Sequence, residues 1–324
     1  MRKQGLLKKL DECVYPAEFL VARLRGKKGG LFRNWEFLLA GSDAVANLQN
    51  TPFYPYLRKY GPPGIWRFLR QEHLWVYKRM NNNLRVLFRS YFVLHEITTL
   101  LVCLRYLSGG KEKERVAQEL QDSLLHDDIQ DILTGSLDFP VMLQALESRL
   151  SSFADTFKGL ADHYESKGIA ALEIFIRNCL WAAIFSQKQP SLLRAFLQYQ
   201  VDYYNCLALA KTLRWQIEAE PAMISGGSVP LERLKQAYLR RDLTPVLNFL
   251  HIRNTDAAAS SIQKLETALL GFISEKLKYW SLQRTVAGEI LFYLWEQYRY
   301  TRNISMVLTT SQVDDEPVRE SIVT

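Results

Sequence analysis

Residues 91–107 read YFVLHEITTLLVCLRYL, and the spacing of their apolar side chains decides the fold class. The apolar positions recur at intervals of three, four and seven residues, which is the stripe of an amphipathic helix. They are Val93, Leu94, Ile97, Leu100, Leu101, Leu104 and Leu107. Helical patterns also run through residues 170–185, 191–215, 262–278 and 287–307, and no stretch alternates strictly between apolar and polar residues. We therefore predict an all-α protein.

Length and composition are those of a globular protein. The chain has 324 residues, of which 48 % are hydrophobic and 23 % charged, enough for two or three domain-sized units. Its longest unbroken apolar run, Cys179–Phe185, is far shorter than the roughly 20 residues of a spanning helix. The first residues lack the apolar stretch of a signal peptide. We therefore predict no membrane span, a cytoplasmic location and four free cysteines, mostly buried.

Positive charge is concentrated in the first third of the chain. Residues 1–107 carry 18 Lys/Arg and 7 Asp/Glu, whereas the whole chain has a net charge of only +7. This asymmetry indicates an acidic partner, a nucleic acid or an anionic membrane surface, or else an ordinary solvated face. Residues 53–89 are both basic and aromatic. They fit either an interface or core aromatics with basic flanks.

Glycine- and proline-rich breaks divide the chain into three related parts. The breaks at residues 107–113 and 224–230 lie near the boundaries of three predicted helical lobes, at residues 1–107, 108–215 and 216–310. Residues 311–324 form an acidic tail that we expect to fray. Stacked helical units of this kind build concave surfaces.

One helix near the end of each lobe carries a related polar pattern. Thr99, Asn205 and Asn303 align, and the residues three positions earlier are Glu96, Asp202 and Tyr300. Six positions later stand Arg105, Lys211 and Thr309. Two of the three copies thus keep an acid, a polar residue and a base at fixed spacing. The pattern favours an internal repeat.

Motifs in the same order run through nearly the whole chain and resemble those of one family. Near the start, Tyr15 precedes Val21-Ala22-Arg23-Leu24-Arg25, and Glu36, Leu38 and Leu39 precede Leu48, Thr51, Phe53 and Tyr54. Asp202, Asn205 and Lys211 form the middle motif, and Tyr293, Glu296, Arg302, Asn303 and Ile304 the last. The family is the connector of archaeal and vacuolar-type rotary ATPases, also known as the C/d subunit. The sequence departs from its pattern at Thr99, Lys211, Tyr300 and Ser305.

The resemblance implies three similar helical lobes arranged as a funnel, and a role without chemistry of its own. A connector sits on the proteolipid ring of the membrane rotor and receives the foot of the central shaft. It thereby passes torque between ATP-driven rotation and the transport of protons or sodium ions. The implied partners are the shaft subunits and the ring, with the membrane surface nearby. The resemblance implies no cofactor, metal, nucleic acid or small-molecule substrate.

Charged and polar residues of these motifs are the candidate interaction residues. Glu96, Arg105, Asp202 and Arg302 are candidates for buried acid–base pairs that lock the lobes, where breaking one pair costs about 3–5 kcal/mol. The alternative is surface pairs that contribute about 0–1 kcal/mol each. The full set is Arg23, Arg25, Glu96, Arg105, Asp202, Asn205, Lys211, Glu296, Arg302 and Asn303.

Two other functions fit parts of the sequence. Asp127, Asp128 and Asp131 match the D-D-x-x-D motif with which all-helical terpenoid and prenyl-diphosphate enzymes bind Mg²⁺, but the second metal motif is missing. The basic, aromatic first third would suit a helical-repeat scaffold that binds nucleic acid. No histidine pair has metal-ligand spacing, and no phosphate-binding glycine motif or nucleophile motif is present.

Overall fold

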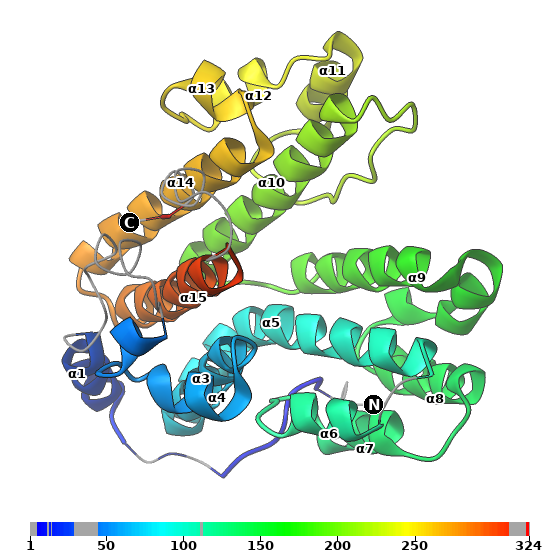
Figure 1. Cartoon of the computed structure of the whole chain (residues 1–324), viewed down its shortest axis with the longest axis vertical. Coiled ribbons are helices and arrows are strands. Elements are labelled where there is room, and N and C mark those ends of the chain that lie inside the picture. Colours follow the sequence, from blue (N-terminus) through cyan, green and yellow to red (C-terminus); the bar gives the residue numbers. More distant parts are fainter. Residues whose placement is uncertain are drawn as a thin grey trace. The chain divides into compact units, whose positions relative to one another are not determined.

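The computed structural model describes residues 5–11, 13, 15–28, 45–110, 113–310 and 322–323. These residues form fourteen α-helices and two short 3-10 helices, η1 (Ala46–Leu48) and η2 (Asp155–Phe157). The β contact among them is an isolated antiparallel bridge between Leu7 and Leu125. The prediction of an all-α protein is confirmed for the described residues (Figure 1).

The chain divides into two compact units, each formed by two stretches of sequence. Unit 1 comprises residues 1–14 and 73–193, and unit 2 comprises residues 15–72 and 194–324. The helices of unit 1 are α5 (Asn82–Ser108), α6 (Lys113–Leu120), α7 (Asp127–Thr134), α8 (Phe139–Ser151) and α9 (Leu160–Phe185). Two helices, α4 (Gly64–Arg79) and α10 (Ser191–Arg214), pass from one unit to the other. The division into three lobes stays a prediction.

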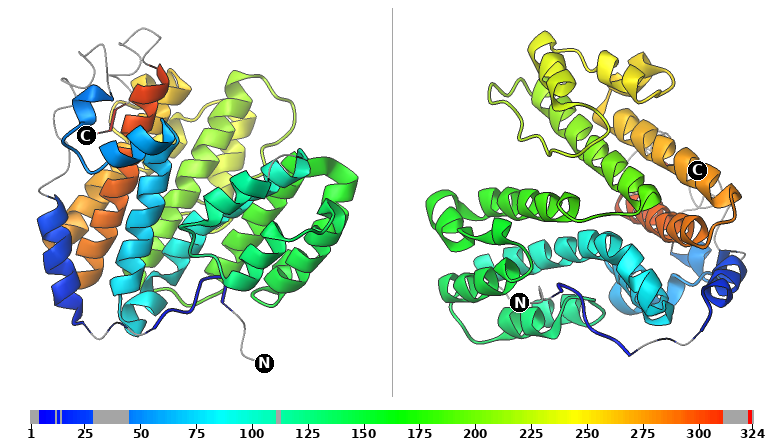
Figure 2. Two further views of the ribbon diagram at one scale, coloured as in Figure 1. Left: turned by 60° about the horizontal axis from the view of Figure 1, so that its bottom comes forward. Right: turned by 180° about the vertical axis from the view of Figure 1, so that it is seen from behind.

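Unit 2 contains the first and last helices of the described chain. Its remaining helices are α1 (Ala17–Lys28), α3 (Tyr54–Tyr60), α11 (Leu231–Arg240), α12 (Thr244–Phe249), α13 (Thr255–Ala259), α14 (Ile262–Leu282) and α15 (Val286–Thr310). Long α14 and α15 pack against each other (Figure 2). Between them the Trp295 indole N–H donates to Ser274 Oγ over 2.8 Å. Phe196 on α10 meets Trp295 edge-to-face at 6.1 Å. Three long helices therefore share one aromatic core.

Helix α5 contains the stretch that decided the fold class. Its N-cap is Asn81, whose side chain accepts a hydrogen bond from the Leu84 N–H over 3.0 Å, and its C-cap is Gly109. The predicted apolar stripe is buried except at its end. Val93, Ile97, Leu100 and Leu104 are each less than 4 % exposed. The helix is thus the core element of unit 1, as its periodicity predicted.

Two helices of the described chain, α5 and α9, are long and apolar enough to cross a membrane by length and composition alone. The sequence prediction that no segment qualifies is therefore wrong, because it counted only unbroken apolar runs. A core helix that packs against its own chain meets the same criteria, and 67 % of the apolar window in α5 is buried inside the protein. The Arg105 guanidinium on α5 also pairs with the Glu173 carboxylate on α9.

The cysteines match the prediction. All four are free thiols, and Cys103, Cys179 and Cys206 are buried. Burial raises the pKa of the Cys179 thiol to about 11 and that of Cys206 further still. Such thiols are un-ionised at neutral pH and behave as small apolar groups.

Unit 1 buries a cluster of histidine and tyrosine rings that the sequence analysis did not identify. His73 and His95 have ring centroids 4.7 Å apart, and both rings contact Tyr91. Burial lowers the pKa of His95 from 6.5 to about 4 and that of His73 well below its ordinary value. Both imidazoles are therefore neutral at physiological pH.

Acid should destabilise the protein through this cluster. The folded pKa of His95 lies below its unfolded value, so its stabilising contribution is present above about pH 6.5 and is lost as pH falls toward 4. The loss amounts to about 3 kcal/mol of unfolding free energy for this one group. We expect His95→Gln to flatten the pH dependence measured by urea unfolding between pH 7 and 4. The exposed control His251→Asn should leave the slope unchanged, and an equal slope in both variants would contradict the assignment.

Candidate functional site

The loop between α10 and α11 is held by a buried carboxylate. Asp202 on α10 is 1 % exposed. It accepts hydrogen bonds from the Ser228 N–H (3.0 Å), the Ser228 hydroxyl (2.5 Å) and the Val229 N–H (3.0 Å). Burial raises the pKa of the Asp202 carboxyl, and the three hydrogen bonds oppose that rise. These donors replace the water that a buried carboxylate has lost.

Asn205 holds the same loop one helical turn further along α10. Its carboxamide donates to the Ile224 carbonyl and accepts from the Ile224 N–H, each over 2.8 Å. The carboxamide thus pairs with both backbone groups of one residue, as a neighbouring strand would. Asn205 is 1 % exposed, so the loop backbone has no water to bond instead.

Two glycines allow the loop to come this close. Gly226 has a φ of 101°, which L-residues with a side chain rarely adopt. A Cβ on Gly227 would lie 2.2 Å from Asp202 Oδ1, closer than any non-bonded contact. The Gly, Ser and Pro content of residues 224–230 predicted a loop there. The structure shows that the loop is fixed rather than open.

On helix α5, the acid that aligns with Asp202 is Glu96, and it binds the segment that follows α6. Glu96 is 5 % exposed, and its carboxylate accepts hydrogen bonds from the Ser123 hydroxyl (2.5 Å) and the Leu124 N–H (2.9 Å). The segment after α6 is fixed on its other side by the first described residues, because the Lys8 N–H donates to the Leu124 carbonyl over 2.8 Å. Thr99, which stands where α10 has Asn205, is 7 % exposed.

On helix α15, the side-chain amide that aligns with Asn205 is Asn303, and it also binds the backbone of a single residue. Asn303 is fully buried, and its Nδ2 donates to the Val323 carbonyl over 2.9 Å. The Val323 N–H lies 3.4 Å from Asn303 Oδ1. Tyr300, which stands where an acid would, packs in an apolar cluster instead.

We call these three arrangements the strap sites: Glu96, Asp202 with Asn205, and Asn303. Ser123 follows Glu96 by 27 residues, and Ser228 follows Asp202 by 26. Ile224 follows Asn205 by 19 residues, and Val323 follows Asn303 by 20. Aligned side chains therefore bind segments at similar distances along the sequence. Helix α10 carries both an acid, as α5 does, and an amide, as α15 does.

Arg25 and Glu296, two further candidates, join α1 to α15 within unit 2. The Arg25 guanidinium makes a two-point contact with the Glu289 carboxylate at 2.6 and 2.5 Å. That contact raises the pKa of Arg25 and lowers the pKa of Glu289. The Lys28 ammonium lies 3.6 Å from Glu296, which also contacts Arg299. Because Arg25 is mostly exposed, its pair contributes little to stability.

Arg105 and Arg302 each pair with an acid on another helix. Arg105 contacts Glu173 with an exposed guanidinium, and this contact raises its pKa. Arg302 is nearly buried and lies 3.0 Å from Glu266 on α14. The sequence pattern predicted that Glu96 and Asp202 also take part in acid–base pairs. The structure gives these two acids hydroxyl and backbone N–H donors.

The remaining candidates, Arg23 and Lys211, lie on the surface of unit 2. The Arg23 guanidinium lies 5.8 Å from the Phe19 ring centroid on α1. Lys211 is exposed near the end of α10. Neither residue joins a strap site. Of the resemblance motifs, Glu36, Leu38 and Leu39 lie outside the described residues.

A second buried network in unit 2 was missed by the sequence analysis. The Tyr293 hydroxyl donates to Glu72 over 2.8 Å, and the Lys27 ammonium lies 2.5 and 2.7 Å from the two oxygens of Glu72. This network connects α1, α4 and α15, and burial raises the pKa of Tyr293. Tyr293 belongs to the last resemblance motif, but nothing in the sequence indicated Glu72 as its partner.

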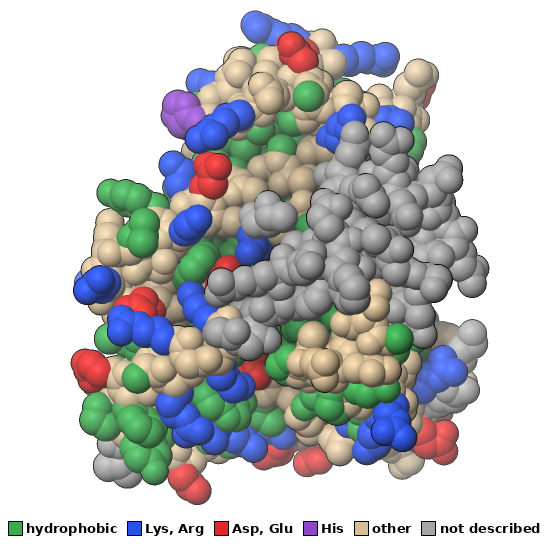
Figure 3. All heavy atoms as spheres, turned by 60° about the vertical axis from the view of Figure 1, so that its left-hand side comes forward, with side chains coloured by type: hydrophobic (Ala, Val, Ile, Leu, Met, Phe, Trp, Pro, Cys, Tyr) green, Lys and Arg blue, Asp and Glu red, His purple; other side chains and the backbone are tan. Residues whose placement is uncertain are grey.

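The basic, aromatic stretch at residues 53–89 contributes mainly to the cores of its units. Phe53 and Phe88 are fully buried, and Arg67 lies 4.2 Å from the Tyr60 ring centroid. The core interpretation therefore fits these residues better than the interface interpretation. On the face shown in Figure 3, described Lys and Arg side chains are interspersed with acidic and apolar ones.

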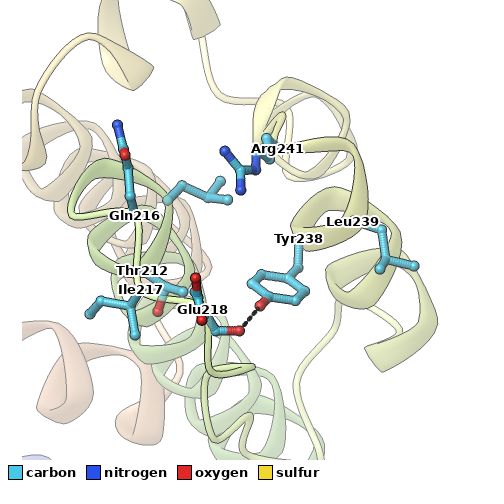
Figure 4. A pocket seen from close by; sticks show the side chains of 8 residues that line it. Thr212, Gln216, Ile217, Glu218, Tyr238, Leu239 and Arg241 are labelled. Carbon is cyan, nitrogen blue, oxygen red and sulfur yellow. Dashed lines mark hydrogen bonds between the residues drawn. The ribbon is translucent and has the colours of Figure 1, made fainter.

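The cavity formed at the ends of α10 and α11 does not gather catalytic groups. The cavity in Figure 4, at the ends of α10 and α11, has a volume of about 260 Å³. In it the Tyr238 hydroxyl donates to the Glu218 carbonyl over 2.6 Å. Among the described residues, no group of three or more His, Cys, Asp and Glu side chains could hold a metal ion.

The D-D-x-x-D motif forms most of the short helix α7. Its N-cap is His126, whose Nδ1 accepts from the Asp128 N–H over 3.3 Å. Asp127 pairs with Lys8, and Asp128 pairs with Arg149. These acids bind side chains of their own unit, which favours the polar-helix interpretation over the Mg²⁺ site.

Comparison with known families identifies the class of protein. The chain matches the family described as ATP synthase (C/AC39) subunit over residues 20–314. It therefore belongs to this family, the connector (C/d) subunits of V/A-type ATPases, as the resemblance implied. Members are non-catalytic structural subunits of a membrane-associated rotary ATPase, so the diphosphate-enzyme alternative is wrong. A comparison with curated proteins found no match.

Adding one methyl group at Gly227, beside Asp202, should destabilise the protein. We expect Gly227→Ala to lower the free energy of unfolding by about 1–3 kcal/mol, because the added Cβ must displace the Asp202 carboxylate. The control Gly271→Ala lies in α14, where a Cβ meets nothing within 4 Å. It should raise stability by about 0.5–1 kcal/mol through helix propensity. Urea unfolding measures both, and equal effects would contradict the packing argument.

Proposed function

We propose that this chain is the central-stalk connector of a V/A-type ATPase or ATP synthase. It joins the rotating shaft to the proteolipid ring and transmits torque for proton or sodium transport. The observation that carries this proposal is the family match over residues 20–314. The repeated strap sites support the three-lobe organisation of such a connector.

Stiffness is the physical property that this role requires, and the contacts among the described residues support it. A subunit that transmits torque must not deform between the two partners that it joins. At each strap site a buried polar side chain satisfies buried backbone groups, and separating them would leave both without hydrogen bonds at about 1–3 kcal/mol per group. The Lys27–Glu72–Tyr293 network adds a buried connection in unit 2.

The proposed partners are the shaft subunits and the proteolipid ring, with the chain peripheral to the membrane on its cytoplasmic side. The proposal includes no nucleic acid, cofactor or small-molecule substrate. The candidate residues with exposed side chains are Arg23, Arg25, Arg105 and Lys211. They are the first positions to cross-link, whereas Glu96, Asp202, Asn205 and Asn303 hold their own chain together.

Co-purification tests the proposed complex. The chain, tagged at its N-terminus, is expressed in its native host and isolated from gently solubilised membranes, followed by mass spectrometry. We expect the nucleotide-binding subunits, the shaft subunits and the proteolipid to be recovered together. The matched control is an untagged strain. Recovery of the tagged chain as a monomer, without these subunits, would refute the connector assignment.

Coupling tests the proposed stiffness. In complexes that contain Asn205→Ala, the loop at Ile224 loses both hydrogen bonds, so we expect fewer ions transported per ATP hydrolysed while ATP hydrolysis persists. Ion uptake and phosphate release are measured on the same vesicles. Complexes with Gly271→Ala should keep the original ratio. An unchanged ratio in fully assembled Asn205→Ala complexes would show that this strap site does not contribute to coupling.

A further inference from the structure

The strap site at Asn303 differs from the other two in the kind of segment that it binds. Glu96 and Asp202 hold segments that continue into further helices, α7 and α11. Asn303 lies in α15, after which no further helix is described, and its partner Val323 belongs to the tail that follows α15. At this site, residues from the stretch after α15 therefore take the place that connecting loops have at the other two sites.

The contact is deeply buried for a tail segment. Val323 is 3 % exposed and Asn303 is fully buried. Ile322 packs against an apolar cluster to which η1, α3, α4 and α15 all contribute. Its buried members are Leu48, Phe53, Leu57, Ile65, Phe68, Tyr300, Ile304 and Val307. A polar anchor and an apolar surface thus hold two adjacent residues of the tail.

We propose that Asn303 and this apolar cluster form a docking site for the tail of the chain, and that the docked dipeptide Ile322–Val323 is the third strap. It joins α15, the last described helix, to the α3–α4 segment near the start of unit 2. Without the dipeptide, the Asn303 carboxamide would be left without this partner beside an exposed apolar surface, which is costly for both groups.

The sequence carries independent support for this docking site. Asn303 aligns with Asn205 in the internal repeat, and both carboxamides pair with the two backbone groups of a single apolar residue. The distances in sequence are also alike, at 20 and 19 residues. A tail that merely rested on the surface would not reproduce the geometry of an internal loop.

Hydrogen exchange tests the proposal on a chain that ends at Ser321. We expect the amides of α15 near Asn303 and those of α3 to exchange about tenfold faster, because opening no longer breaks the tail contact. Amides of α5 in unit 1 should not change. Adding Asn303→Ala to this truncation should have little further effect, because both changes remove the same contact. Adding Asn205→Ala to the truncation should instead increase exchange by as much as Asn205→Ala does in the full chain, because it removes a different contact.

Two further measurements keep the test decisive if the truncated chain is poorly folded. Val323→Pro keeps the chain length but removes the N–H that faces Asn303, and it should raise α15 exchange in the same region. A synthetic peptide with the sequence of the last nine residues should restore slow exchange to the truncated chain. Unchanged α15 exchange in both the truncation and Val323→Pro, or fully additive effects with Asn303→Ala, would overturn the proposal.

Discussion

The described structure depends on one constraint: a backbone segment that crosses a buried helix surface must find hydrogen-bond partners there. In this chain the partners are side chains of the helices themselves. Glu96 supplies carboxylate oxygens to Ser123 and Leu124, and Asn303 supplies a carboxamide to Val323. The helix α10 supplies both kinds through Asp202 and Asn205. Each arrangement fixes a loop or a tail segment where water is excluded.

This constraint explains why Asp202, Asn205 and Asn303 of the family motifs are buried. A buried acid with hydroxyl and N–H donors stabilises one arrangement of helix and loop, because any other arrangement strands the charge. Surface ion pairs such as Arg25–Glu289 add little by comparison. The strap sites are buried, whereas Arg23, Arg25, Arg105 and Lys211 have exposed side chains.

The departures from the family pattern also have local physical reasons. Tyr300 stands where the aligned helices α5 and α10 have Glu96 and Asp202, and it packs in the apolar cluster with Ile304 and Val307, where a carboxylate would be stranded. Ser305, another of the departing positions, accepts a hydrogen bond from the Trp66 indole N–H over 3.1 Å. Tyr300 thereby belongs to the apolar surface on which Ile322 packs.

The sequence by itself determined the all-α fold, the long helices and the alignment of Glu96, Asp202, Asn205 and Asn303, because helical periodicity and fixed spacing are local properties. It also placed the chain in its family through the order of its motifs. Only the tertiary structure decided what those side chains bind: Ser123, Ser228, Ile224 and Val323 lie 19 to 27 residues away. The membrane-length character of α5 and α9 and the His73–His95 pair were likewise missed. Partners across such distances are set by how helices pack, which no local pattern encodes.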